Sequence, residues 1–229
     1  MSERPTNAHT TRKTPLTRER VVAAALRIVD RDGLDKLTMR ALGTELGVDP
    51  MAVYHHLPNK AAVLDGVAEA VMCEVPLDIA TEGPWQEQLA EFARGYRATL
   101  RAHPNALPVL ATRPDTSRAA LRVIDTAIGI LLGAGLGPSD AVKAMHTASC
   151  LIMGHALDEF GFPLLVAEDL SVTPTGTDHS DESEDADYPH LMAVVSVSTE
   201  IGVDDTFEMG LTSMIAGFAA RVSPTAGRR

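Results

Sequence analysis

Cysteine is scarce in this chain, and its scarcity excludes two classes of small protein. Of the 229 residues only Cys73 and Cys150 are cysteines, and each lies inside an apolar helical pattern. Two such thiols provide neither a disulfide framework nor a zinc finger. The chain also lacks an apolar run long enough to cross a bilayer, and its start, MSERPTNAHTTRKTP, lacks the apolar centre of a signal peptide. We therefore expect a cytoplasmic protein with no membrane partner.

Motifs of catalysis and cofactor binding are missing as well. The sequence contains no Gly-rich phosphate loop, no nucleophile elbow and no paired metal motif. His146, Cys150 and His155 share one helical segment, and the first two are four residues apart, which a metal site would allow. Cys150 and His155 are five apart and fall on different faces, so a structural role explains the group better. We expect no enzyme activity, no cofactor and no metal.

What the chain does contain is a helix-turn-helix pattern from 37 to 60, LTMRALGTELGVDPMAVYHHLPNK. Thr38 is placed to cap a short helix, and Gly47 is placed to end it in a left-handed conformation. Asp49 is placed to cap a second helix that has Pro50 at its first position. So short a turn matches the motif that lays its second helix in the DNA major groove. A helix pair inside a bundle would show a similar pattern and is the alternative.

The second helix of this pattern divides into a buried and an exposed set. Val53 and Leu57 are four residues apart and are expected to be buried. The residues left exposed are Pro50, Met51, Ala52, Tyr54, His55 and His56. A helix over 16–32 and another that starts at Lys60 carry apolar stripes that complete a three-helix core. These features predict a DNA-binding domain over residues 16–73.

The net charge of −11 is unevenly distributed along the chain. Residues 1–70 carry +1 and residues 71–229 carry −12, so the acidity belongs to the second part. Residues 1–20 carry +3, from Arg4, Arg12, Lys13, Arg18 and Arg20 against Glu3 and Glu19. We expect residues 1–15 to form a disordered basic arm, which either touches DNA phosphates or is only a solvated tail.

Residues 16–73 resemble the DNA-binding domain of the TetR family of transcriptional repressors. The resemblance rests on LTMRALGTELGVDPMAVYHHLPNKAAVL, the supporting helix before it, and the start of the next helix at Asn59. We expect a dimer that places two recognition helices one DNA turn apart on a palindromic operator. The residues expected to read bases are Arg40, Pro50, Met51, Ala52 and His55. Those expected to hold phosphates are Thr38, Tyr54, His56 and Lys60.

Helical periodicity continues beyond this domain with almost no strand signal, so we expect an all-α fold. Helices are predicted over 85–103, 115–136, 139–160, with Ser139 as the cap, and 204–222. Their expected apolar rows are Leu89, Phe92, Tyr96 and Leu100; Leu121, Ile124, Ile128 and Leu131; Val142, Met145, Ser149, Ile152, Met153 and Ala156; and Phe207, Leu211, Met214 and Phe218. Residues 74–222 are expected to form a ligand-binding and dimerisation domain, followed by a flexible tail over 223–229.

An acidic stretch over residues 168–190 interrupts the helical pattern. It holds eight acidic residues and no Lys or Arg. So little apolar surface cannot order the segment, and we expect a disordered loop between helices. A calcium site is the alternative, but the acids lack the spacing and the glycine of a calcium-binding loop.

The second domain is similar to the regulatory domain of the tetracycline repressors within the same family. The similarity rests on the helix that begins at Trp85, the triplet 112–114, and the long helices that follow. It implies that the helices over 139–160 and 204–222 pair across a two-fold axis as a four-helix bundle. Gly210 and Gly217 are seven apart and would line one strip where a partner helix approaches. The alternative is that these rows face the domain's own core.

The resemblance also implies a pocket for a drug-sized organic inducer. Its expected residues are Phe92, Tyr96, Thr112, Arg113, Asp125, Met153 and Asp158, a mostly apolar wall with a few polar groups. In the tetracycline repressors a histidine before the triplet binds the drug-chelated magnesium, and Val109 takes that position here. A pair of histidines at the end of the fourth helix of those repressors is also replaced, by the 74–76 region here. Tetracycline is therefore not the expected inducer. The aromatic residues and Met153 could instead only pack the core.

Together these features predict a homodimeric repressor that a small organic inducer releases from double-stranded operator DNA. The alternative is a helical small-molecule-binding protein or an enzyme in which the helix-turn-helix is only structural.

Overall fold

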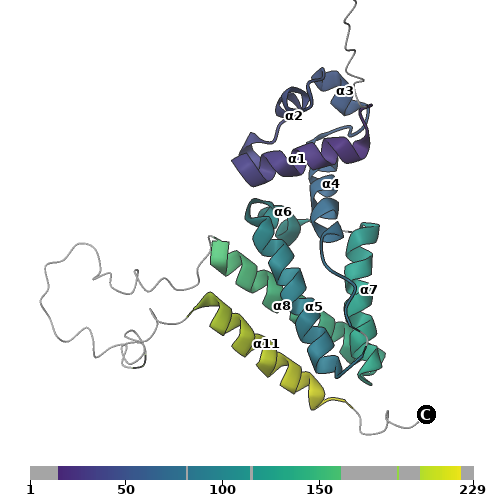
Figure 1. Ribbon diagram of the computed structural model, residues 1–229, viewed down its shortest axis with the longest axis vertical. Helices are drawn as coiled ribbons and strands as arrows, with labels where there is room; N and C mark the ends of the chain where they lie inside the picture. Colours follow the sequence, from purple (N-terminus) through teal and green to yellow (C-terminus); the bar gives the residue numbers. More distant parts are fainter. Residues whose placement is uncertain (1–14, 81, 114–115, 161–189, 191–201, 223–229) are drawn as a thin grey trace, which may run out of the picture. The chain divides into compact units, whose positions relative to one another are not determined.

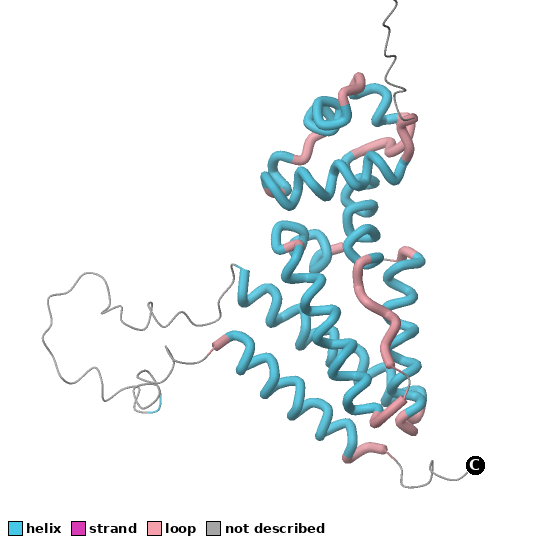
Figure 2. Tube along the Cα trace, in the orientation of Figure 1, coloured by secondary structure: helices cyan, strands magenta, loops and turns pink. Residues whose placement is uncertain are grey.

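The computed structural model describes residues 15–80, 82–113, 116–160, 190 and 202–222, and the regular structure in these ranges is helical (Figures 1 and 2). The helices are α1 (Arg18–Asp32), α2 (Met39–Leu46), α3 (Pro50–Tyr54), α4 (Lys60–Cys73), α5 (Trp85–Ala102), α6 (Leu107–Thr112), α7 (Arg118–Gly133), α8 (Pro138–Phe160) and α11 (Val203–Ala219). Two short 3-10 turns, η1 (Leu34–Lys36) and η2 (Pro104–Ala106), lie between them. The prediction of an all-α fold is confirmed.

The chain divides into two compact units, residues 1–67 and residues 68–229. The boundary falls inside α4, whose first half belongs to the first unit and whose second half belongs to the second. The predicted boundary, after residue 73, lay at the end of this helix. A continuous helix hides such a boundary from sequence patterns because the chain shows no linker there.

The first unit is a three-helix core joined to the start of α4. Thr17 caps α1 by accepting a hydrogen bond from the Arg20 amide at 3.3 Å, and Gly33, at φ 83°, ends this helix. The buried aliphatic side chains include Val21, Ile28, Leu42, Val53, Leu57, Val63 and Val67. Each such side chain contributes about 1.5–3 kcal/mol when it leaves water. This burial holds α2 and α3 in place on α1.

The second unit packs α5, α7, α8 and α11 around a common core, and α6 contacts α8. Figure 1 shows α11 running alongside α8 and α5, and both helices contact it. Ser117 caps α7 by accepting a hydrogen bond from the Ala120 amide at 3.2 Å. The predicted cap of α8 was wrong, because α8 begins at Pro138 and Ser139 lies inside its first turn.

The buried faces of α7, α8 and α11 differ from the predicted rows. On α7 the buried residues include Val123, Ala127 and Leu131, whereas Leu121 is 53% exposed and Ile124 is 37% exposed. The buried row of α8 consists of Ala141, Ala144, Ala148, Ile152 and Ala156, and that of α11 of Phe207, Leu211 and Ile215. Alanine allows helix backbones to approach closely. Close packing therefore buries the helix face with small side chains rather than the face with the largest side chains.

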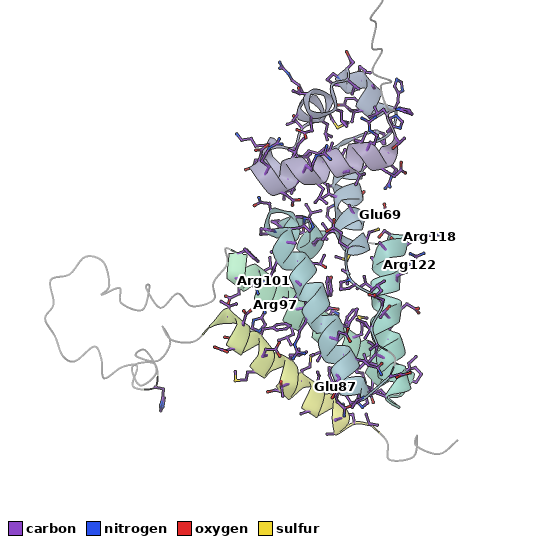
Figure 3. All side chains as sticks on the ribbon, viewed as in Figure 1. Glu69, Glu87, Arg97, Arg101, Arg118 and Arg122 are labelled. Carbon is purple, nitrogen blue, oxygen red and sulfur yellow. The ribbon has the colours of Figure 1, made fainter. Side chains whose placement is uncertain are left out.

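Two arginines of α5 join α11 to the end of α8. Arg97 is buried and pairs with Glu159 at 3.2 Å and with Asp204 at 2.7 Å (Figure 3). Arg101 contacts the same two carboxylates at 2.8 and 2.9 Å, and its label lies beside Arg97 on α5 in Figure 3. The α5–α8–α11 ion-pair cluster therefore brings the end of α8 and the start of α11 to one place on α5.

Three sequence-based expectations lie outside the described residues. They are the basic arm, apart from Pro15, the acidic loop, apart from His190, and the tail over 223–229.

Candidate DNA interface and ligand cavity

The turn between α2 and α3 is built as the sequence predicts. The Thr38 hydroxyl accepts a hydrogen bond from the Ala41 amide at 3.0 Å, and Gly47 adopts the left-handed conformation at φ 66°. The Asp49 carboxylate accepts from the Met51 amide at 2.8 Å, with Pro50 at the start of α3. These capping predictions are confirmed. They fix where α3 begins and therefore which of its residues are exposed.

A glycine on α2 allows α3 to lie close to it. A Cβ added at Gly43 would lie 3.0 Å from both the Cγ of Pro50 and the carbonyl oxygen of Val48. The Gly43 carbonyl also accepts a hydrogen bond from the Val48 amide at 2.9 Å. The turn therefore packs directly on the α2 backbone, and a larger residue at 43 would displace it.

The exposed surface of α3 carries large uncharged side chains. Val53 and Leu57 are buried, as predicted, whereas Met51 is 63% exposed and Tyr54 is 41% exposed. Exposed side chains of this size without an intramolecular partner surface are typical of a binding face. The helix ends at Tyr54, so the two histidines 55 and 56 follow it in a turn rather than on the helix.

Charged groups lie beside α3 at the starts of α2 and α4. Arg40 is exposed on the first turn of α2. Lys60 is exposed at the start of α4, and its Nζ lies 3.5 Å from the Leu34 carbonyl oxygen. Asn59 caps α4 by accepting from the Ala62 amide at 2.8 Å. The positive end of this helix and the Lys60 ammonium both favour a negatively charged group such as a phosphate.

The second unit contains a cavity of about 280 Å³ between α4, α5, α6, α7 and α8. Its lining residues are Met72, Phe92, Tyr96, Leu110, Arg113, Ala120, Val123, Ile124, Ala127, Met145, His146 and Ser149. The rings of Phe92 and Tyr96 lie with their centroids 6.3 Å apart. The volume is near the lower end of the range of ligand sites, about 300–1,000 Å³. The wall is mostly apolar with a few polar groups.

Three of the seven residues predicted for a pocket line this cavity, namely Phe92, Tyr96 and Arg113. Thr112 is exposed and its hydroxyl donates to the Pro108 carbonyl, and Asp125 is also exposed. Met153 and Asp158 are partly buried on α8 but lie outside the cavity lining. Val109 is buried in α6 and is not among the lining residues.

Sequence reasoning missed Met72 on α4, Leu110 on α6 and most of the lining residues on α7. Met145 and Ser149 belonged to the predicted row of α8, and Ile124 to that of α7, but each was assigned to packing. The spacing of apolar residues along each helix does not show that residues of different helices meet at one cavity. A cavity depends on the angle between helices, which periodicity along one helix does not fix.

The polar lining residues of α8 have sulfur partners. The Ser149 hydroxyl donates to the Met145 sulfur at 3.7 Å, and His146 Nε2 lies 3.7 Å from the Cys150 sulfur. His155 packs edge-on against the ring of Phe207 at 5.5 Å, and burial lowers the pKa of its imidazole. His155 therefore belongs to the contact between α8 and α11, whereas His146 and Cys150 do not take part in that ring contact.

The described ranges contain neither a metal cluster nor a membrane-spanning helix. No group of three or more His, Cys, Asp or Glu residues there is placed to hold a metal ion. None of the helices described is both long and apolar enough to cross a bilayer.

Comparisons with known families match both units. Residues 21–67 match the model of the bacterial regulatory proteins of the tetR family, and residues 79–222 match that of the tetracyclin repressor-like C-terminal domain. The chain is 31% identical to the class A tetracycline repressor protein from transposon 1721 of Escherichia coli, over 91% of this chain and 93% of the relative. It is 30% identical to an HTH-type transcriptional regulator of Saccharopolyspora erythraea, over 90% and 85% of the two chains.

Solved structures are similar to this chain as well. Apo ActR from Streptomyces coelicolor superposes with a TM-score of 0.78 at 28% identity, covering 91% of this chain and 97% of that one. ActR in complex with actinorhodin gives a TM-score of 0.78 at 27% identity, covering 93% and 100%. TetR from Acinetobacter baumannii gives 0.63 at 29% identity, covering 91% and 100%.

Proposed function

Because the chain belongs to the TetR family of bacterial transcriptional regulators, we propose that it is a homodimeric repressor released from a palindromic operator by a small organic inducer. The observation that carries this proposal is the exposed α3 surface, held by the capped turn and flanked by Arg40 and Lys60. A regulator of this kind acts in the cytoplasm, where its operator lies.

Two groups of residues contact the operator in this proposal. The base-reading group is Arg40, Pro50, Met51, Ala52 and His55, in which Met51 and Ala52 offer apolar contact to thymine methyl groups. The phosphate-binding group is Thr38, Tyr54, His56 and Lys60. The Thr38 oxygen already accepts an amide hydrogen bond, so its hydroxyl proton remains available to a phosphate oxygen.

The dimer forms through the exposed faces of α8 and α11. The exposed residues along α11 include Met209, Thr212, Ser213, Ala216 and Gly217, a helical stripe without charge. A Cβ added at Gly217 meets no atom within 4 Å, so this position is open in the protomer. A Cβ added at Gly210, by contrast, would lie 3.0 Å from the Cδ1 of Leu151 in the same chain. We therefore assign the partner contact to the Gly217 end of the stripe.

The inducer occupies the cavity of the second unit, and α4 carries its effect. Met72 near the end of α4 lines the cavity, and Lys60 lies at the start of the same helix. A ligand that contacts α4 more favourably in one arrangement of the dimer shifts the population toward that arrangement. Release follows when the favoured spacing of the two recognition helices does not fit successive major grooves.

A mobility-shift experiment on the DNA that flanks the protein's own gene tests the proposal. We expect a sequence-specific shift that survives excess unrelated DNA, and loss of this shift in a Tyr54→Ala/Lys60→Ala double variant. The control is Lys143→Ala, an exposed position on α8 paired with Asp140. Equal binding to all sequences, or no shift at low salt, would reject the repressor proposal and leave a structural helix-turn-helix.

A further inference from the structure

We propose that the cavity selects apolar ligands that carry an acidic oxygen group, such as a carboxylate, a sulfonate or an ionised phenol. This inference rests on the proposed function of the cavity as the inducer site and names the chemical class of the inducer.

The charge of the lining is the first observation. Residues 71–229 carry a net charge of −12, yet none of the described residues that line the cavity is a carboxylate. Arg113 is the cation among the described lining residues, and His146 adds an imidazole ring. In an acidic domain, a wall with positive and no negative side chains favours an anion over a cation.

The exposed charges on the first turns of α7 contribute little inside the cavity. Arg118 and Arg122 are exposed on the first turns of α7, where Figure 3 labels them, and Ala120 and Val123 of the same turns line the cavity. Asp125 on the following turn is exposed as well, so solvent screens all three charges and the lining residues themselves decide the preference.

The hydrogen-bonding groups of the lining are mostly donors. Arg113 has only donors, and the Ser149 hydroxyl now donates to the Met145 sulfur. His146 likewise has the Cys150 sulfur as its neighbour at 3.7 Å. Sulfur is a weak acceptor, so a ligand oxygen can replace it at little cost in hydrogen-bond energy. Charged oxygens accept the strongest bonds from such donors.

The remaining lining accommodates an apolar ring system. Phe92 and Tyr96 provide aromatic faces, and Met72 and Met145 provide flexible side chains that adapt to irregular shapes. An apolar body against this wall and one acidic group at Arg113 would use both parts of the cavity.

Two fluorescent probes with one ring system test the inference. They are 1-anilinonaphthalene-8-sulfonate and N-phenyl-1-naphthylamine, which lacks the sulfonate. We expect saturable binding of the sulfonate about tenfold or more tighter than that of the amine, since a hydrogen bond to a charged group contributes this much. Arg113→Gln should remove this preference and leave the affinity for the amine unchanged. Arg113→Lys should retain much of it, and Arg122→Gln, outside the lining, should retain all of it.

The outcomes separate this inference from the proposed function. If both probes bind saturably with equal affinity, and Arg113→Gln changes neither, the acidic-group inference is wrong while the cavity remains a ligand site. If neither probe binds saturably, or if binding survives a cavity-filling Ala127→Phe substitution, the cavity is not the ligand site and the proposed function loses its inducer. Loss of both probes in Arg113→Gln and Arg113→Lys would give Arg113 a structural role and overturn the proposal.

Discussion

At the scale of single residues, two glycines allow the helices of the first unit to pack closely. Gly43 lets the turn and Pro50 lie against α2, because a Cβ at this position would lie only 3.0 Å from the Cγ of Pro50. Gly66 does the same for α4 and α1, because a Cβ there would lie 2.6 Å from the Cγ2 of Val22. These contacts fix the position of the exposed residues around α3, on which the proposed reading of DNA depends.

Gly66→Ala should destabilise the first unit by about 1–3 kcal/mol, because the added methyl group overpacks the contact with Val22. Urea unfolding of full-length protein measures this loss. Val22→Ala makes room for the added methyl group. The Gly66→Ala/Val22→Ala variant should therefore lose less stability than the sum of the losses in the two single variants. Simple additivity would show that Gly66 does not act through Val22.

Arg40→Ala should weaken operator binding by about 1–3 kcal/mol per half-site and relax the preference at one base position, as the loss of a bidentate guanine contact would. Selection of operators from a random DNA pool measures the preference. If the variant selects the same sequence as the parent, Arg40 does not read a base.

Lys60→Ala should weaken binding to all DNA sequences alike and lower the salt dependence by about one unit per half-site, because a phosphate contact releases counterions. Affinity measured at several salt concentrations gives this slope. Lys143→Ala in the second unit is the matched control and should leave the slope unchanged. An equal slope in parent and Lys60→Ala protein would contradict the phosphate contact.

At the scale of helices, ion pairs rather than apolar contacts alone hold α11 to α5. Arg94 pairs with Glu208 through two contacts at 2.7 and 2.6 Å, next to the buried Arg97. The guanidinium of Arg97 also lies 4.4 Å from the centroid of the Phe207 ring. Removing one partner from the buried part of this cluster would leave a charge without compensation, which is more costly than the loss of a surface pair.

The cluster makes the α5–α11 contact sensitive to acid. Hydrogen bonds from Arg97 lower the pKa of Asp204 below its ordinary value of 3.8, and those from Arg94 lower the pKa of Glu208 below 4.5. A carboxyl group whose pKa is lower in the folded state stabilises the fold at any pH above its ordinary pKa. This stabilisation is lost as the pH falls through the pKa of the folded state. Arg94→Ala should therefore cost about 1 kcal/mol or less near neutral pH, with the difference from the parent shrinking in acid.

Urea unfolding between about pH 6 and pH 3 measures this difference. Arg122→Ala, an exposed arginine without an ion pair to a described residue, is the control and should show no such trend. A difference between parent and Arg94→Ala that stays constant into acid would exclude Glu208 as the source.

At the scale of the whole molecule, the proposed dimer depends on the uncharged stripe of α11. Gly217→Leu should leave the fold of one protomer intact, because no atom lies within 4 Å of the added Cβ. It should cost the dimer about 1–3 kcal/mol for each copy by overpacking the contact with the partner. Sedimentation should then show monomers, and operator affinity should fall with dimerisation.

Gly129→Leu is the matched control, since Gly129 is also an open helical glycine but lies on α7. It should remain dimeric. A Gly217→Leu protein that stays dimeric and binds operator at micromolar concentration would place the dimer contact elsewhere.

The sequence was sufficient where structure depends on neighbours along the chain. Thr38, Gly47 and Asp49 end and start helices through bonds that span at most a few residues, so their roles were predictable. The apolar faces of α7 and α8 were predicted less well, because Ala stripes and larger side chains compete for burial on the same helix. Of the candidate ligand residues, Phe92, Tyr96 and Arg113 line the cavity, and the operator contacts stay predictions.

By itself, then, the sequence determined the all-α class, the helix-turn-helix and the family, because caps, turns and periodicity are local properties of the chain. Only the tertiary structure decided which helix faces are buried, that Arg97 joins α5, α8 and α11, and that His146 and Ser149 share a cavity with Arg113. These features depend on the angles and distances between helices far apart in the chain. Close packing of all the side chains sets those angles, and no single segment encodes them.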